Sequence, residues 1–197
     1  MNAMEQIFSI IKMNNGVITS AMLNENGISR GNLKYLADTG RLVNVSRGVY
    51  ILPEVLEDEI FNLQTRFKRG VYSFETALFL WNLTDRTPIR YTMTFPKGYN
   101  LSGPKEENVR CVQNIKELYE QGIVKVATPG GNMVNCYCME KTLCDILRPR
   151  MKFDIQVIAE AFKQYMLRKD KNIPLLSEYA KKLQVGNKVR SYLEVLQ

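Results

Sequence analysis

The spacing of hydrophobic and polar positions in residues 16–52 predicts two short helices followed by a β-hairpin. Apolar residues recur at helical spacing in 20–26 and again in 29–38. Residues 41–45 then alternate between polar and apolar, and the apolar residues 49–52 return after a tight turn at Ser46-Arg47-Gly48, as in a hairpin. Helix, helix and hairpin in this order are typical of a winged helix, in which the second helix enters the major groove of DNA.

Capping and stop residues fall at the ends of these predicted helices. Ser20 is expected to cap the first helix, and Gly27 to end it, because a helix stop often needs a residue that tolerates positive φ. Ser29 is expected to cap the second helix, which Thr39 and Gly40 then stop. The sequence therefore predicts where each of the two helices begins and ends.

The whole chain predicts an α+β protein, with an N-terminal winged helix-turn-helix followed by a mixed α/β domain that ends in helices. Turn formers in residues 96–107 predict a loop. Helices are predicted at 4–13, 60–67, 73–81, 142–147, 154–166, 174–183 and 189–196, and short strands at 90–95, 109–112, 123–127 and 135–139.

Three parts are expected along the chain. Residues 1–55 form the winged-helix DNA-binding domain, residues 56–70 a connecting helix, and residues 71–197 the C-terminal domain. No Gly/Ser-rich or Pro-rich tract separates them, so we expect the parts to pack together without a flexible linker.

Charge is sorted along the chain. The net charge is +7, and most of the excess lies in residues 148–197, where a second nucleic-acid contact is an open alternative to a solvated face. Within residues 29–48, the four cations Arg30, Lys34, Arg41 and Arg47 accompany a single acid, Asp38. A basic surface of this kind suits a domain that meets phosphate.

The residues expected to read DNA lie on the second helix and at the hairpin tip. Leu33, Leu36 and Ala37 are expected to face inward, which leaves polar and aromatic side chains outside. Arg and Lys can reach guanine or phosphate, and Asn can pair with adenine. The predicted DNA-binding residues are Ser29, Arg30, Asn32, Lys34, Tyr35 and Arg47. The alternative is a winged helix that serves as a protein-interaction module.

Catalytic and metal chemistry find little support. The chain has no histidine, so the usual proton shuttle is missing, and no catalytic residue, metal site or cofactor is expected. The cysteines Cys111, Cys136, Cys138 and Cys144 are expected to be reduced, buried thiols. A structural role is expected for the carboxylates Glu75, Asp85, Glu140 and Asp145. Without an apparent signal peptide or membrane-length apolar run, a cytoplasmic location is expected.

Three segments resemble the AbiEi-type antitoxins, regulators of bacterial type IV toxin–antitoxin systems in abortive infection. The first is the winged helix, with Gly40-Arg41-Leu42 and Arg47-Gly48-Val49-Tyr50. The second is residues 73–78 with 83–88, and the third is residues 139–148, which are similar to the family's Glu-Arg/Lys-Thr-x-x-Asp helix. The winged helix alone is unspecific, whereas the order of all three segments is more specific.

This resemblance implies an antitoxin that acts in phage defence and represses its own operon by binding inverted repeats in double-stranded DNA. It also implies that residues 71–197 form an antitoxin domain, which counters a nucleotidyltransferase-like toxin without needing a stable complex. The residues that match the family's helix are Glu140, Lys141, Thr142 and Asp145. Two alternatives stay open: a plain DNA-binding transcription factor with a ligand-sensing C-terminal domain, and an enzyme domain after residue 70.

Overall fold

The computed structural model describes residues 2–149 and 152–196, which divide by their contacts into two compact units. The N-terminal unit comprises Met1–Lys68 together with Ala127–Val134. The C-terminal unit comprises Arg69–Val126 together with Asn135–Gln197.

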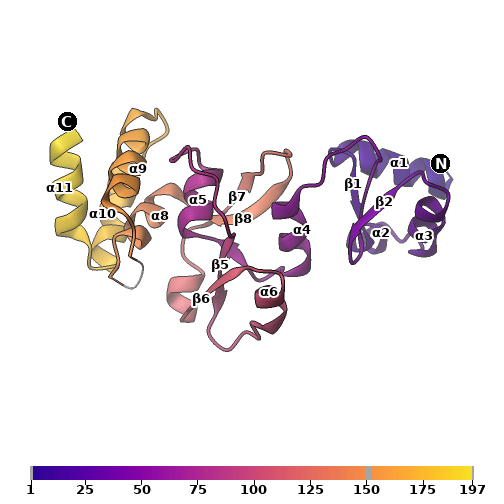
Figure 1. Ribbon diagram of the computed structural model, residues 1–197, viewed down its shortest axis with the longest axis horizontal. Helices are drawn as coiled ribbons and strands as arrows, with labels where there is room; N and C mark the ends of the chain where they lie inside the picture. The colour runs from indigo at the N-terminus through magenta and orange to yellow at the C-terminus, as the bar shows by residue number, and fades with distance from the viewer. Residues whose placement is uncertain (1, 150–151, 197) are drawn as a thin grey trace. The chain divides into compact units, whose positions relative to one another are not determined.

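The N-terminal unit has the winged-helix layout that the sequence predicts (Figure 1). Its three strands form an antiparallel sheet in the order β1-β3-β2, so the wing hairpin β2–β3 is extended by the strand that precedes the helix-turn-helix. The elements are α1 (Ala3–Met13), β1 (Val17–Thr19), α2 (Ser20–Glu25), α3 (Gly31–Asp38), β2 (Val43–Ser46), β3 (Val49–Ile51) and α4 (Glu59–Arg66).

A small apolar core holds the first three helices together. Ile7 and Ile11 of α1 pack against Leu23 of α2 and against Leu33 and Leu36 of α3. All five side chains are almost fully buried, so the i, i+3 and i, i+4 spacings seen in the sequence face this core.

The N-terminal caps of α2 and α3 differ from those expected. The side chain of Thr19, not Ser20, caps α2: its Oγ1 accepts a hydrogen bond from the Met22 N–H at 3.2 Å. Thr19 has the extended backbone that an N-cap residue needs, whereas the Ser20 N–H donates to the Gly48 carbonyl of the wing. Ser29 Oγ accepts from the Gly31 N–H at 3.3 Å, one position before the assigned cap Arg30, which has no side-chain cap of its own.

Asp58 organises the start of α4. One carboxylate oxygen accepts the Phe61 N–H at 3.0 Å and caps the helix. The other accepts hydrogen bonds from the Thr128 hydroxyl and, at 2.9 Å, from the Asn132 amide, within the segment 127–134. A Cβ at Gly130 would lie 2.7 Å from this second oxygen, so a side chain there would displace the Asp58 carboxylate from its hydrogen bonds.

The C-terminal unit combines a five-stranded sheet with a group of helices (Figure 1). The strand order is β6-β5-β4-β8-β7, with β4 antiparallel to β5 and parallel to β8, and β5 parallel to β6. The strands are β4 (Val71–Tyr72), β5 (Thr92–Pro96), β6 (Arg110–Asn114), β7 (Ile123–Ala127) and β8 (Met133–Tyr137). The helices are α5 (Phe74–Leu80), α6 (Ser102–Glu106), α7 (Lys116–Tyr119), α8 (Met139–Ile146), α9 (Ile155–Leu167), α10 (Ile173–Lys182) and α11 (Gly186–Leu196).

Several boundaries in this unit differ from the prediction; the helix expected at 142–147 lies at 139–146, and the strand expected at 90–95 lies at 92–96. The stretch 96–107 contains the short helix α6 rather than only a loop. The strand expected at 135–139 lies at 133–137, because α8 already begins at Met139. The α+β class itself, with helices at the C-terminal end, is confirmed.

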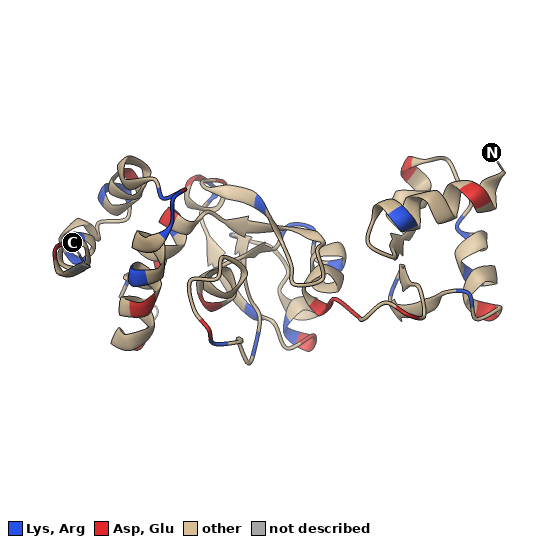
Figure 2. Cartoon of the chain, turned by 90° about the horizontal axis from the view of Figure 1, so that it is seen from above, with Lys and Arg blue, Asp and Glu red and all other residues tan. Residues whose placement is uncertain are grey.

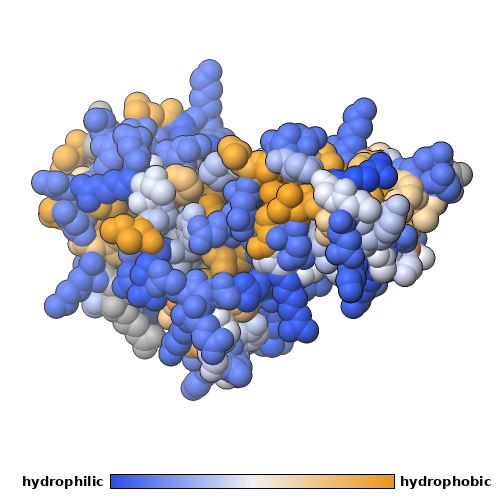
Figure 3. All heavy atoms as spheres, turned by 45° about the vertical axis from the view of Figure 1, so that its right-hand side comes forward, coloured by the Kyte–Doolittle hydropathy of each residue, from blue (hydrophilic) through white to orange (hydrophobic). Residues whose placement is uncertain are grey.

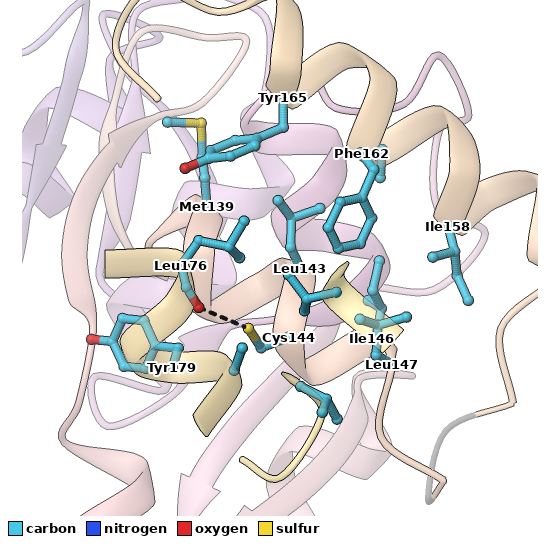
Figure 4. Packing of buried hydrophobic residues seen from close by; sticks show 14 of the residues in the cluster. Met139, Leu143, Cys144, Ile146, Leu147, Ile158, Phe162, Tyr165, Leu176 and Tyr179 are labelled. Atoms are coloured by element: carbon cyan, nitrogen blue, oxygen red, sulfur yellow. Dashed lines mark hydrogen bonds between the residues drawn. The ribbon is translucent and has the colours of Figure 1, made fainter. Parts of the chain in front are cut away.

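The main core of the C-terminal unit surrounds α8. Figure 4 shows side chains from α8, α9 and α10 meeting in one cluster, with Leu143 and Phe162 at its centre. The thiol of Cys144 donates to the Leu176 carbonyl at 3.8 Å, which ties α8 to α10. Every residue of α8 is buried, the charged ones included.

Hydrophilic residues dominate the face drawn in Figure 3, where hydrophobic residues gather in separate patches. Among residues 2–149 and 152–196, no helix is long and apolar enough to cross a membrane.

Candidate nucleic-acid interface

The outer face of α3 carries the side chains expected to read DNA. Leu33 and Leu36 anchor the helix in the core, so the intervening Lys34 and Tyr35 point away from it. Both are exposed, and Tyr35 keeps 56% of its surface accessible, which is unusual for a large aromatic side chain. Ala37, which was expected to face inward, is half-buried.

Arg30 is held in place by the preceding helix. Its Nε donates to the Asn24 side-chain oxygen at 2.9 Å, across the turn between α2 and α3. Because a guanidinium has five N–H donors, this contact fixes the fork while its other donors remain available to a phosphate or a base. The contribution of Asn24 had no signal in the sequence, since its role depends on the angle between the two helices.

Ser29 and Asn32 interact with the start of α3. The Asn32 amide donates to the Ser29 carbonyl at 3.1 Å, and Ser29 Oγ accepts the Gly31 N–H. Both side chains therefore order the helix start, and reading adenine through Asn32 would require its amide to leave this contact.

The wing places Arg47 at its tip. Arg47 and Gly48 form the turn between β2 and β3, and the Arg47 side chain is exposed. Gly48 has φ +75°, and a Cβ there would lie 3.1 Å from Ser20 Oγ, so this turn favours glycine. Arg41, the remaining cation of the region, stacks on the Phe8 ring of α1 at 4.6 Å from its centroid.

The charges of this unit are separated along the chain. Figure 2 shows blue Lys and Arg positions together with red ones, such as Glu25 and Asp38, on the helices of this unit, and red acidic positions in the segment after β3. That segment holds Glu54, Glu57, Asp58 and Glu59. The helix and wing that carry Arg30, Lys34 and Arg47 are therefore the positive part of the domain.

The four residues predicted to form an antitoxin motif lie in the C-terminal unit, inside a buried polar network. Lys141 Nζ lies 2.6 Å from Asp145 Oδ2 and 3.4 Å from the centroid of the Tyr137 ring. Asp145 also faces Arg148, with Oδ1 3.4 Å from Nη1. The Thr142 hydroxyl donates to the Tyr137 carbonyl at 3.4 Å. Each polar group on this helix thus has a partner within the same unit.

Glu140 belongs to the same network through a tyrosine. The Tyr165 hydroxyl donates to Glu140 Oε1 at 2.9 Å and accepts the Asn172 N–H at 2.8 Å. Burial, reinforced by the neighbouring Glu140 carboxylate, raises the pKa of Tyr165, so its hydroxyl keeps its proton and remains a donor. The exposed fractions of Glu140, Lys141, Thr142 and Asp145 are between 1% and 4%, so a partner could not touch them in this conformation.

The cysteines are free thiols, two of them fully buried. Burial raises the pKa of Cys136 and raises that of Cys144 to about 12, which keeps both protonated and unreactive at neutral pH. The described part of the chain holds no group of three or more acidic, cysteine or histidine residues arranged for a metal ion.

The N-terminal unit thus combines a winged-helix layout with exposed cations on α3 and at the wing tip. Residues 5–53 match the family described as "Transcriptional regulator, AbiEi antitoxin". The predicted resemblance to AbiEi-type antitoxins is therefore confirmed, and the match covers the helix-turn-helix and the wing.

A solved structure with a similar fold is the RV2827C protein from Mycobacterium tuberculosis. The two chains are 14% identical, with a TM-score of 0.53 over 98% of this chain and 80% of that one. This likeness concerns the fold, and it extends the comparison beyond residue 53 to both units. No curated protein matches the chain.

Proposed function

We propose that the protein is the antitoxin and autoregulatory repressor of a bacterial type IV toxin–antitoxin operon, with a role in phage defence. The observation that carries this proposal is the AbiEi family match over a winged helix whose outer face is basic. The protein binds inverted repeats in its own operator, and its C-terminal unit counters a nucleotidyltransferase-like toxin.

The proposed DNA contacts follow from the geometry of the reading surface, which comprises Arg30, Lys34, Tyr35 and Arg47. Lys34 and Tyr35 are exposed on the helix that enters the major groove, and Arg30 is oriented at its start by Asn24. Arg47 at the wing tip reaches the phosphate backbone or the adjacent minor groove. The outward-facing members of the predicted set, Arg30, Lys34, Tyr35 and Arg47, therefore carry affinity and specificity. Ser29 and Asn32 chiefly support the helix start.

Electrophoretic shifts on the operon's own promoter test the repressor role. We expect Arg30→Ala and Lys34→Ala each to cost about 1–3 kcal/mol if they contact bases, and Arg47→Ala to weaken binding evenly across sequences. Lys12→Ala is the matched control, because Lys12 is an exposed cation near the end of α1, outside the reading surface. Equal affinities for all four variants at physiological salt would refute the assigned contacts.

Neutralisation of the toxin is assigned to the C-terminal unit. The buried network of α8 contributes by maintaining the fold of that unit, while neutralisation proceeds from its surface, directly or indirectly, and without a stable complex. Repression and protection should therefore separate in the full-length chain. Variants that lose operator binding through Arg30 or Lys34 should still protect cells that express the neighbouring toxin gene.

Growth of those cells is the measurement, with immunoblots to verify equal antitoxin levels. A variant that has lost operator binding, is present at normal levels and gives no protection would show that the two roles cannot be separated. Protection that follows operator binding in every variant would favour a plain repressor.

A further inference from the structure

A cavity of about 760 Å³ opens on the C-terminal unit, beside the core of Figure 4. It lies where the end of α8, the start of α9 and one face of α11 come together. Its walls are largely apolar and include Ile146, Leu147, Ile158, Tyr192 and Val195. A volume of this size falls within the range of small-molecule sites.

Apolar side chains remain uncovered at this cavity. Ile155 is 70% exposed and Val195 is 84% exposed, although both line the cavity and most large apolar side chains of the unit are buried. Leaving such a surface in water forgoes the gain from burying it, so an apolar ligand that covered these residues would bind favourably.

The charges at the cavity are all positive. Arg148, Lys152 and Lys188 line it, and no Asp or Glu is found among its described lining residues. Lys188 Nζ donates to the Leu147 carbonyl at 3.0 Å, which fixes the ammonium at the end of α8. Arg148 is the next residue after Leu147 in the sequence. An ammonium has three N–H donors, so Lys188 can also bind an anionic group.

Charge and hydrophobicity are separated along α11. Lys188, Tyr192 and Val195 lie at i, i+4 and i+7, so all three share one face of the helix. Lys188 and Val195 are separated by about 10 Å along the helix axis, from the rise per residue. The cavity therefore has a cationic end and an apolar end, which matches a ligand with a single anionic head and one apolar tail.

We propose that this cavity binds a single-chain anionic amphiphile, with its carboxylate or phosphate head at Lys188 and Arg148 and its tail along Ile158, Tyr192 and Val195. An acidic helix from a partner would instead place its carboxylates on both sides of its apolar face. Two of the three cations of this cavity, Arg148 and Lys188, lie where α8 ends and α11 begins, so the charge favours the small amphiphile. The proposal is independent of the proposed function, because it concerns only binding to the C-terminal unit.

Isothermal titration calorimetry of the full-length protein tests it, with hexanoate, octanoate and decanoate kept below their micelle concentrations. We expect one molecule to bind, with the affinity rising roughly tenfold for each pair of added methylenes as more of the tail is buried. Decanol should bind more weakly than decanoate, because it lacks the charge. Decyl phosphate in a parallel titration distinguishes a phosphate head from a carboxylate head.

Two variants locate the ligand. Lys188→Gln should weaken decanoate binding about tenfold and leave decanol binding unchanged, because only the head contact is lost. Ala159→Trp should abolish binding of both, because Ala159 lines the cavity and is exposed, so an indole there fills the space. Lys163→Gln is the matched control, since Lys163 is an exposed cation of α9 outside the cavity.

Circular dichroism of each variant verifies that it folds. The proposal is overturned if decanoate does not bind, if decanol binds as tightly as decanoate, or if both variants retain native affinity. Binding of an acidic amphipathic peptide in place of decanoate would likewise assign the cavity to a protein partner and overturn it.

Discussion

Breaking the buried ion pair on α8 should destabilise the C-terminal unit more than any surface change. The side chains of Lys141 and Asp145 are each only 2% exposed, and their charged atoms lie 2.6 Å apart. Removing one partner of such a pair leaves a buried charge without compensation, which costs about 3–5 kcal/mol. The two single variants should differ, because the partners that remain are different.

Lys141→Met should fall near the lower end of that range, because Asp145 keeps Arg148, whose side chain is 20% exposed. Asp145→Leu should fall near the upper end, because it leaves both cations without a carboxylate, with only the Tyr137 ring against Lys141. The double variant Lys141→Met/Asp145→Leu removes the pair together, and its free energy of unfolding should lie within about 1 kcal/mol of the native value. The cycle thus predicts strong coupling between the two positions.

Urea unfolding followed by the fluorescence of Trp81 is a suitable assay. Trp81 is the only tryptophan in the chain, and its indole N–H donates to the Tyr137 carbonyl at 2.8 Å, beside the ring that covers Lys141. Its signal therefore reports on this network. Lys182→Met is the matched control, since its i, i+4 partner Glu178 forms a largely exposed pair, whose loss should cost less than about 1 kcal/mol. A double variant as unstable as the sum of the two single variants would refute the reasoning.

Three further predictions concern other parts of the chain. Asn24→Ala should weaken operator binding several-fold without unfolding the domain, because it releases Arg30, and electrophoretic shifts alongside circular dichroism would detect this. Asp58→Ala should lower the free energy of unfolding of the N-terminal unit by about 1–3 kcal/mol, since it removes a helix cap and the acceptor of Thr128 and Asn132. Asp58→Asn should lose less, because its amide oxygen can still accept some of these hydrogen bonds. The free energy of unfolding should decline as pH rises above 9: burial raises the pKa of Cys144 from 9.0 to about 12, so the unfolded chain loses this proton first. Cys144→Ala should show a shallower decline in urea titrations between pH 8 and 11.

The helix-turn-helix could be predicted because its determinants are local. Leu33 and Leu36 show the buried face of α3, and Gly27 and Gly40, with φ of +68° and +71°, mark the points where the two helices end. A serine or threonine beside a helix start is a weaker guide, because the choice between Thr19 and Ser20 depends on which backbone is extended.

Pairing between distant segments could not be predicted in the same way. Tyr72 of β4 pairs with Cys136 of β8 in parallel, and nothing in either short strand specifies the other. The hydrogen bonds from Thr128 and Asn132 to Asp58 are equally remote in the sequence, so the assignment of residues 127–134 to the N-terminal unit by contact had no local signal.

The same difference between local and remote information explains the candidate sites. The exposure of Lys34 and Tyr35 follows from helical periodicity, so the reading surface could be predicted, although the Asn24 contact that orients Arg30 could not. On α8, charged residues normally indicate a solvated face. Lys141 and Asp145 are at i, i+4 spacing, which suits an ion pair, but only the packing of α9 and α10 against α8 buries that pair.

The burial of Lys141 and Asp145 limits the functions that α8 can have. A side chain that is 1% exposed and paired within its own unit cannot recognise a toxin, whereas it can decide whether the unit folds. If Glu140, Lys141, Thr142 and Asp145 are shared with the family, they point to a shared interior rather than to a shared contact surface. If the C-terminal unit neutralises a toxin, the determinants should be sought among its exposed residues. Substitutions in α8 should then abolish protection only to the extent that they unfold the unit, which parallel measurements of growth and of Trp81 fluorescence would show.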